Sequence, residues 1–349
     1  VQLSGIALLL EGMSKGTVPF VAGLVLATAL AVAWAWMGGL RSVAWTDAVQ
    51  AVVMMVSALL VLSSVLERVG GLSTLFARLE EQSPQWLAVP GNGYFTFSTF
   101  LGLSLPWFFF ALSNPQVSQR LFTPRSLGSL RRMLMGFLVF GLLYTLISIL
   151  WGLAGKVLLP GLPNPDLVTP SLLGSEWVPP AVALVAMGGI VAAAISTIDS
   201  VLLTLASMVA RDLVRVVVPH ASERLQLRVG QLAIPVIALM AFAFARLRLG
   251  LIALLAVASS AGLLVTVPAI VGAFYWPRGN GAGALASVLG GGATVVALYV
   301  TGARPLGMWP GVWGLAVSTA LFVTVSLVAR PSPKAAVAAF REAVHRTPA

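Results

Sequence analysis

The chain has 349 residues, of which 58% are hydrophobic and only 9% are charged, and its mean hydropathy is +0.97. Soluble domains usually carry about 25% charged residues, so this composition excludes an ordinary water-soluble protein. The absence of cysteine excludes disulfide bonds and thiolate chemistry.

Apolar segments follow one another along the whole chain. A helix needs roughly 20 apolar residues to cross the bilayer core. The sequence therefore predicts an all-α polytopic membrane protein, with a transmembrane domain at residues 1–330 and a polar cytoplasmic tail at residues 331–349. About ten transmembrane helices are predicted, at residues 1–12, 18–38, 44–66, 94–113, 133–158, 179–210, 229–246, 249–275, 281–302 and 306–329. The first begins abruptly at Val1, so we expect the chain to lack earlier spans.

Two longer segments between the predicted spans differ in character. Residues 68–92 include "LSTLFARLEEQSPQWL", whose pattern predicts a short amphipathic helix on the membrane surface. Residues 159–178 are rich in Pro, Gly and Asn, which indicates a segment of turns. Neither segment divides the chain into separate domains.

The basic residues are distributed unevenly between the two sides of the predicted bundle. If the segment around Arg41 is cytoplasmic and the sides alternate, the inner side holds twice as many of the 21 Lys and Arg residues as the outer side. This is the positive-inside bias of membrane proteins. It predicts a multi-pass protein of the plasma membrane, surrounded by the lipid bilayer, with a cytoplasmic C-terminus. The net charge of +10 then reflects topology, and no nucleic acid partner is expected.

Asp47 opens the third predicted span, in the stretch "GGLRSVAWTDAVQAVVMM". Arg41 precedes it, and Trp45 suits the membrane interface. One interpretation is that Asp47 is a first-turn acid stabilised by the helix dipole. The other is that its carboxylate lies where a cation leaving the protein reaches the cytoplasm.

The stretch "SLPWFFFALSNPQVSQRLFTPRS" predicts a broken helix, because Pro106 and Pro115 bracket a span with three consecutive phenylalanines. Broken helices inside a membrane occur where they line a cavity, and transporters place binding sites there. Aromatic side chains at such a break can close over a small substrate. The alternative is a lipid-facing helix that proline kinks.

A single acid, Asp199, interrupts the apolar segment 181–210. At 100° per residue, the hydroxyls of this span, including those of Ser196 and Thr197, share with Ala193 one arc of about 100°, and Asp199 lies just off its edge. Hydroxyl, carbonyl and carboxylate oxygens suit a hard monovalent cation such as Na⁺. The alternative is that Ser and Thr merely let helices pack closely. Because ionisable residues inside membranes mark functional sites, we expect an ion or proton site here.

Three stretches together resemble the sodium:solute symporter family, which includes sodium/proline, sodium/pantothenate, sodium/sugar and sialic acid transporters. They are "GGLRSVAWTDAVQ", "NPQVSQRLFTPRSL" and "AAAISTIDSVLLTLASMVARDLVR". A fourth stretch, "LPGLPNPDLVTPSLL", is similar to the proline and pantothenate branch. The resemblance implies a LeuT-like core of five plus five helices in inverted repeats. It places residue 1 in the family's fourth helix, so we expect the core to be partial.

The resemblance also implies the residues that bind the ion and the solute. The family's sodium ligands fall on the carbonyl of Ala193 and the hydroxyls of Ser196 and Thr197. A second cation site of some members shares Ser196 and falls further on Asp47, Asp199 and Ser200. Because Asp199 replaces a hydroxyl of those members, this second site is expected to hold sodium, a proton or only an internal hydrogen bond. The substrate and gate positions fall on Trp107 and Phe110, so the pattern of the sugar transporters is absent.

These observations predict a secondary active transporter that couples inward sodium movement to the uptake of a small organic solute. The solute is expected to be a carboxylate or amino-acid-like molecule, and Na⁺, as coupling ion, takes the place of a cofactor. A proton-coupled symporter of the same fold is the nearest alternative, and a non-transporting, symporter-like membrane sensor is another. An enzyme is not expected, because the sequence shows neither a metal-ligand cluster nor a nucleophile paired with a base.

Overall fold

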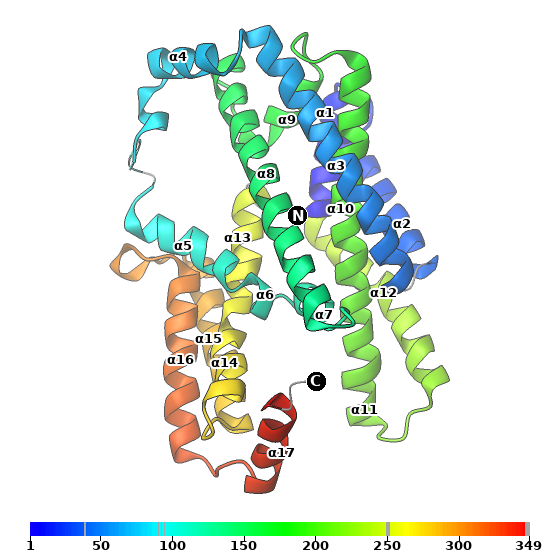
Figure 1. Cartoon of the computed structure of the whole chain (residues 1–349), viewed down its shortest axis with the longest axis vertical. Helices are drawn as coiled ribbons and strands as arrows, with labels where there is room; N and C mark the ends of the chain where they lie inside the picture. Colours follow the sequence, from blue (N-terminus) through cyan, green and yellow to red (C-terminus); the bar gives the residue numbers. More distant parts are fainter. Residues whose placement is uncertain (38–39, 90, 92, 94, 249–251, 346–349) are drawn as a thin grey trace. The chain divides into compact units, whose positions relative to one another are not determined.

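The structure, a computed structural model, describes residues 1–37, 40–89, 91, 93, 95–248 and 252–345. Within these residues all regular structure is helical, which confirms the predicted all-α fold (Figure 1). The chain divides into two compact units, one formed by Val1–Ala88 and Leu121–Ile252 and the other by Val89–Arg120 and Ala253–Ala349. The predicted spans and tail also include residues 38, 94, 249–251 and 346–349, which lie outside the described residues.

Eight helices in the described part of the chain are long and apolar enough to cross a membrane. They are Phe20–Met37, Val43–Val69, Leu127–Leu158, Pro180–Val217, Glu223–Arg246, Leu255–Tyr275, Gly281–Thr301 and Pro310–Val328. Two further apolar helices, α1 (Gln2–Met13) and α5 (Phe97–Phe108), have 12 residues each. Twelve residues rise about 18 Å, less than the roughly 30 Å of the hydrocarbon core. The ten predicted spans therefore correspond to eight long helices and two shorter ones.

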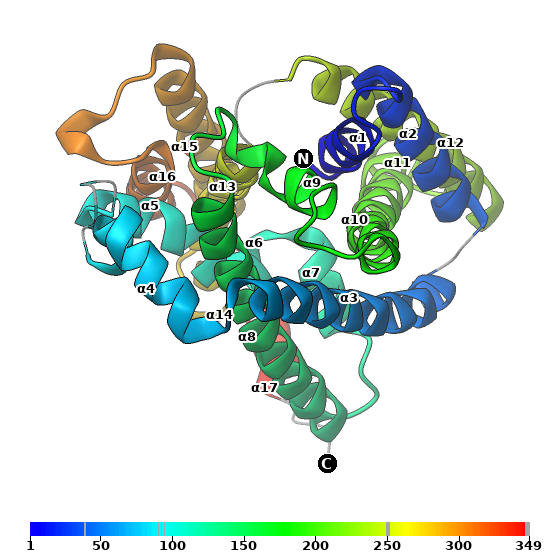
Figure 2. The same ribbon diagram turned by 90° about the horizontal axis from the view of Figure 1, so that it is seen from above.

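The first unit is arranged around one central helix, α10. Its long helices are α2 (Phe20–Met37), α3 (Leu40–Val69), α8 (Leu127–Leu158), α10 (Pro180–Met208) and α12 (Glu223–Arg246). Its shorter elements are α1, α4 (Leu72–Gln82), 3₁₀ turns at Pro84–Leu87 and Pro165–Leu167, α9 (Val168–Leu173), a π-helix at Val209–Leu213 and α11 (Val214–Val217). Seen from above, α1, α2 and α12 gather on one side of α10, and α3 crosses it on another (Figure 2).

Apolar side chains bury two sides of α10. Near the start of the helix, Ala186 belongs to a cluster that also contains Val61 and Val65 of α3. Further along, Ile195 and Leu202 lie in clusters with small alanines of α2. Small residues let membrane helices approach closely, so these clusters hold α2 and α3 against different faces of α10.

Both segments between the predicted spans of this unit contain helix. The predicted amphipathic helix is present as α4, which buries Leu75 and Leu79 in the same cluster as parts of α3 and α10. The turn-rich segment is more ordered than its composition indicated, because α9 buries Leu172 and Leu173. The position of α4 on the membrane surface stays a prediction.

The second unit contains the broken helix and the C-terminal helices. Its elements are α5, α6 (Phe110–Ser113), α7 (Pro115–Leu121), α13 (Ile252–Leu263), a 3₁₀ turn at Leu264–Thr266, α14 (Val267–Tyr275), α15 (Gly281–Thr301), a 3₁₀ turn at Pro305–Gly307, α16 (Pro310–Val328) and α17 (Lys334–His345). Small residues join α15 to α16, where Gly291 faces Ser318 and the Ser318 hydroxyl donates to the carbonyl of Ser287 at 3.2 Å. The segment predicted as a cytoplasmic tail contains α17.

Polar caps fix the beginning of several helices. The side chains of Thr96, Ser126, Ser222 and Asn280 each accept the backbone N–H of the residue three positions later, at the starts of α5, α8, α12 and α15. Each such cap stabilises a helix by about 1 kcal/mol. These residues therefore explain why the helices begin where they do.

Candidate cation site

Three residues of α10 bring their oxygens together. The hydroxyl of Ser196 donates to the carbonyl of Ala193 at 2.9 Å, and the hydroxyl of Thr197 donates to the same carbonyl at 3.2 Å. Each hydroxyl uses its proton in this bond and keeps its oxygen lone pairs available. The residues predicted to bind sodium thus form one small cluster of oxygens on a single turn of α10.

This oxygen cluster faces α3 rather than α2. Ala194 and Ile195 are buried against α1 and α2, whereas Ser196 is only half-buried. The direction of α3 is given by Gly189, since a Cβ added there would overlap the hydroxyl of Ser57. Gly189 falls about 20° from Ser196 around the helix. The hydroxyl arc of α10 therefore faces α3.

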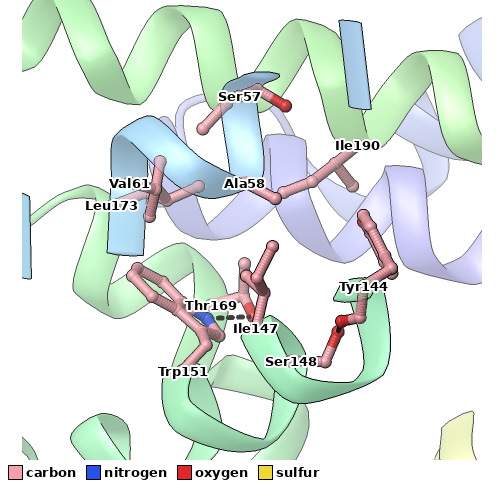
Figure 3. Close-up of a pocket in the computed structure, with 11 residues that line it drawn as sticks. Ser57, Ala58, Val61, Tyr144, Ile147, Ser148, Trp151, Thr169, Leu173 and Ile190 are labelled. Atoms are coloured by element: carbon pink, nitrogen blue, oxygen red, sulfur yellow. Dashed lines mark hydrogen bonds between the residues drawn. The ribbon is translucent and has the colours of Figure 1, made fainter. Parts of the chain in front are cut away.

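A cavity of about 340 Å³ lies nearer the start of α10 than the cluster does (Figure 3). It lies between α3, α8, α9 and α10, and its wall includes Ala186 and Ile190, which precede Ala193 on the same side of α10. Across the cavity, the indole N–H of Trp151 donates to the hydroxyl of Thr169 at 3.1 Å. The part of its lining nearest to the oxygen cluster is Ile190, about one turn before Ala193, and its volume lies within the range of small-molecule sites.

Asp199 is buried with no exposed surface, and it lies on a neighbouring face of α10. The single proton of the Ser200 hydroxyl is shared between the carbonyl of Ser196, at 2.7 Å, and the Oδ1 of Asp199, at 3.3 Å. Ile195 and Leu202, one turn before and after Asp199, pack toward α2. The structure thus brings Asp199 together with Ser200 and connects Ser200 to the first oxygen cluster.

The register of α3 against α10 places Asp47 at the height of Asp199. The two helices are antiparallel, because the end of α3 packs against the beginning of α10. Both helices rise by the same distance per residue. Residues of α3 and α10 that are equally far in sequence from the contact between Ser57 and Gly189 therefore lie at similar depth. Asp47 comes ten residues before Ser57, and Asp199 ten residues after Gly189. The two carboxylates therefore lie at similar depth along their helices, to within about one turn.

The same count identifies Gln50, which the sequence analysis did not single out. Gln50 lies two turns before Ser57 on the same face of α3, and it comes level with Ser196. Its Oε1 atom is buried without a hydrogen-bond partner in the described part of the chain. A buried carbonyl without a partner costs about 1–3 kcal/mol, which a bound cation would offset. The spacing of Asp47, Gln50 and Ser57 indicates a polar side of α3. The sequence alone does not show that this side of α3 packs against α10.

The predicted substrate residues, Trp107 and Phe110, lie in the second unit. The helix breaks at Phe109, between α5 and α6, and again at Asn114, between α6 and α7. At the first break the rings of Trp107 and Phe110 lie 5.1 Å apart between centroids, tilted by 40°. The structure therefore confirms the broken helix and brings these two aromatic side chains together.

The oxygens around α10 and α3 favour an alkali cation over a transition metal. Within the described ranges, no three His, Cys, Asp or Glu residues are grouped closely enough to hold a metal ion. The available donors are hydroxyl, carbonyl, amide and carboxylate oxygens. Such hard, weakly charged oxygens suit Na⁺ better than soft or nitrogen-preferring metals.

Comparison with known proteins gives a family match over most of the chain. The model of the sodium:solute symporter family matches residues 1–291. The osmoregulated proline transporter OpuE of Bacillus subtilis is 27% identical over 321 residues, covering 90% of this chain and 64% of that protein. The sodium/pantothenate symporter of Haemophilus influenzae is 27% identical over 240 residues, covering 64% of this chain and 49% of that protein. The chain thus spans between half and two thirds of the length of these relatives.

A solved structure shares the fold. It is described as the substrate-bound outward-open state of a Na⁺-coupled sialic acid symporter, with a TM-score of 0.70 and 20% sequence identity. The match covers 95% of this chain and 73% of that chain. This likeness confirms the predicted LeuT-like, polytopic helical fold.

Proposed function

The chain belongs to the sodium:solute symporter family, and we propose that it couples the inward movement of Na⁺ to the uptake of a small organic solute. The observation that carries this proposal is the convergence of the Ser196 and Thr197 hydroxyls on the carbonyl of Ala193. An ion inside a membrane needs oxygens to replace its lost water. This cluster supplies three of them on one turn of α10.

The ion is proposed to bind between α10 and α3. The cluster on α10 provides carbonyl and hydroxyl oxygens, and the buried amide oxygen of Gln50 on α3 is proposed as a further ligand. Asp47, one turn nearer the start of α3, provides a negative charge that attracts the cation. Together these groups are proposed to form a route for the ion, from the oxygen cluster of α10 along α3 to the beginning of that helix.

Asp47, Asp199 and Ser200 are proposed as a second cation site. Support comes from the bond between Ser200 and Asp199 and from the common depth of the two carboxylates. One residue, Ser196, connects both sites through its carbonyl, which accepts the Ser200 hydroxyl. A proton on Asp199 would instead make the transporter proton-coupled, which is the alternative that Asp199→Asn tests below.

The driving force follows from the charge of the ion. Each positive charge that moves inward gains about 2.3 kcal/mol per 100 mV of membrane potential. For coupling, bound sodium must favour the arrangement that binds solute better, and linkage then requires that solute also tightens sodium binding. The proposed topology places the C-terminus in the cytoplasm of a plasma-membrane protein, in agreement with the distribution of basic residues.

A carboxylate-bearing or amino-acid-like solute is proposed as the substrate. The named relatives transport proline and pantothenate, and both molecules carry a carboxylate. Trp107 and Phe110 are proposed to close over the solute at the break between α5 and α6. Aromatic rings at this position provide a contact surface for a small, partly apolar molecule.

Uptake by the chain in proteoliposomes tests the proposal. Labelled proline, pantothenate and a sugar are offered with an inward gradient of Na⁺, of K⁺ or of protons. We expect uptake of a carboxylate solute only with the sodium gradient, and no uptake of the sugar. Equal uptake with K⁺, or uptake driven by protons alone, would contradict sodium coupling.

A further inference from the structure

A second, larger cavity lies at the opposite end of α10 from the one in Figure 3. There α10 widens into the π-helix Val209–Leu213, and the chain turns through α11 into α12 (Figure 1). The cavity has a volume of about 730 Å³ and lies between the ends of α2 and α10 and the beginning of α12. It is separate from the residues proposed for cation and solute binding.

The inner wall of this cavity is mostly apolar. Leu203 and Ala206 of α10 face Ile234 of α12 across it, and Trp36 contributes from the end of α2. Ala206 and Ile234 are buried in a cluster with alanines of α2. Two polar residues, Ser207 and Gln231, also line the cavity, so its wall is apolar for the larger part, which suits hydrocarbon.

The rim of the same cavity is strongly basic. Arg211, Arg215 and Arg224 line it, and all three residues are exposed. Within the described part of the chain none of the three forms an ion pair, although Glu223 also lines the rim and Asp212 follows Arg211. The rim therefore has three guanidinium groups and one carboxylate among its lining residues, and it carries an excess of positive charge.

We propose that this cavity binds the headgroup of an anionic phospholipid. Arginine forks bind phosphate oxygens bidentately, and basic pockets between membrane helices suit anionic headgroups. The apolar wall would take the first part of an acyl chain, and the polar ends of α10 and α12 place the rim at the membrane boundary. A free phosphate would use the rim but would leave the apolar wall without a ligand. The proposal goes beyond symport, and it does not depend on the cation site.

Lipid binding is tested with the purified chain in detergent by native mass spectrometry, using phosphatidylglycerol and phosphatidylcholine. We expect phosphatidylglycerol to be retained in preference to phosphatidylcholine. Replacing all three rim arginines (Arg211→Ala, Arg215→Ala, Arg224→Ala) should weaken phosphatidylglycerol binding at least about tenfold, since each arginine attracts the anionic headgroup. The matched control replaces three exposed arginines near the start of α8 (Arg125→Ala, Arg131→Ala, Arg132→Ala) and should bind as the original chain does.

Two further measurements keep the test sharp if the triple variant folds poorly. Leu227→Glu places a negative charge at the rim on an exposed residue, so it should weaken phosphatidylglycerol binding without disturbing the core. Inorganic phosphate at millimolar concentration should not displace the lipid. Equal loss of binding in the control triple, or complete displacement by phosphate, would overturn the proposal.

Discussion

Ser57 of α3 lies directly against Gly189 of α10, with no room for a side chain on the glycine. This contact fixes the register of the two helices. Counted from this contact, Gln50 comes level with Ser196, which is why we propose that α3 contributes to the candidate cation site. We therefore expect the candidate site to depend on Gly189, although glycine has no side chain that could bind an ion.

Gly189→Ala should destabilise the protein, because the added Cβ overlaps the Ser57 side chain. Overpacking of this kind costs about 1–3 kcal/mol. Thermal unfolding in detergent should show a lower Tm, and a second substitution, Ser57→Gly, should recover part of the loss. The control is Gly188→Ala, where nothing lies within 4 Å of the new Cβ. Equal Tm values for the two alanine variants would show that the helices do not meet at Gly189.

Asp199→Asn tests the second cation site against proton coupling. The change keeps the shape of the side chain and removes its charge, so we expect a weaker and less steep dependence of uptake on sodium. Uptake in sodium-free buffer should stay negligible at every pH in both proteins. Asp212→Asn, which changes an exposed acid beyond the same helix, should behave as the original chain does. Uptake driven by a pH gradient without sodium, and abolished by Asp199→Asn, would establish proton coupling instead.

Gln50→Ala should raise the sodium concentration that gives half-maximal uptake. The amide oxygen is buried without a hydrogen-bond partner among the described residues, and loss of one neutral ligand to a charged group costs about 1.5–3 kcal/mol. The expected increase is about tenfold or more. Gln231→Ala on α12 removes a half-buried amide elsewhere and serves as the control. An unchanged sodium dependence in Gln50→Ala would remove α3 from the ion's coordination.

Trp107→Ala and Phe110→Ala should impair solute binding without changing sodium binding. Each ring that covers a solute contributes about 1.5–3 kcal/mol through buried surface, so the solute concentration for half-maximal uptake should rise about tenfold. Phe108→Ala removes a neighbouring ring that is 78% exposed and should have little effect. If Phe108→Ala is as damaging as the other two, the rings support the helix break rather than the solute.

Membrane physics explains why so much of the fold could be predicted. Every backbone group inside lipid must be satisfied within a helix, so long apolar segments identify helices directly. The hydroxyl cluster on α10 was predictable for a similar reason, because the helical period places Ala193, Ser196 and Thr197 on one arc. The prediction of each helix and of the hydroxyl cluster uses information from one segment of the chain only.

The features that could not be predicted arise where two distant segments of the chain pack against each other. Gln50 gains its significance from Ser196, which lies on another helix, and only the contact at Gly189 sets their register. The turn-rich segment gave no sign that Leu172 and Leu173 would be buried, since proline and glycine indicate turns and not where a segment packs. The arginine-lined cavity likewise depends on α2, α10 and α12 meeting at one end.

Equilibrium binding of ²²Na⁺ to the purified chain, without solute, tests the central claim most directly. The test variant combines Ser196→Ala with Thr197→Val. The control variant is Ser207→Ala, which removes a hydroxyl about three turns from Ser196 that donates to the carbonyl of Thr204. We predict saturable sodium binding that is at least about tenfold weaker in the double variant and unchanged in Ser207→Ala. Sodium binding of equal strength in all three proteins would contradict a cation site at the Ala193 carbonyl.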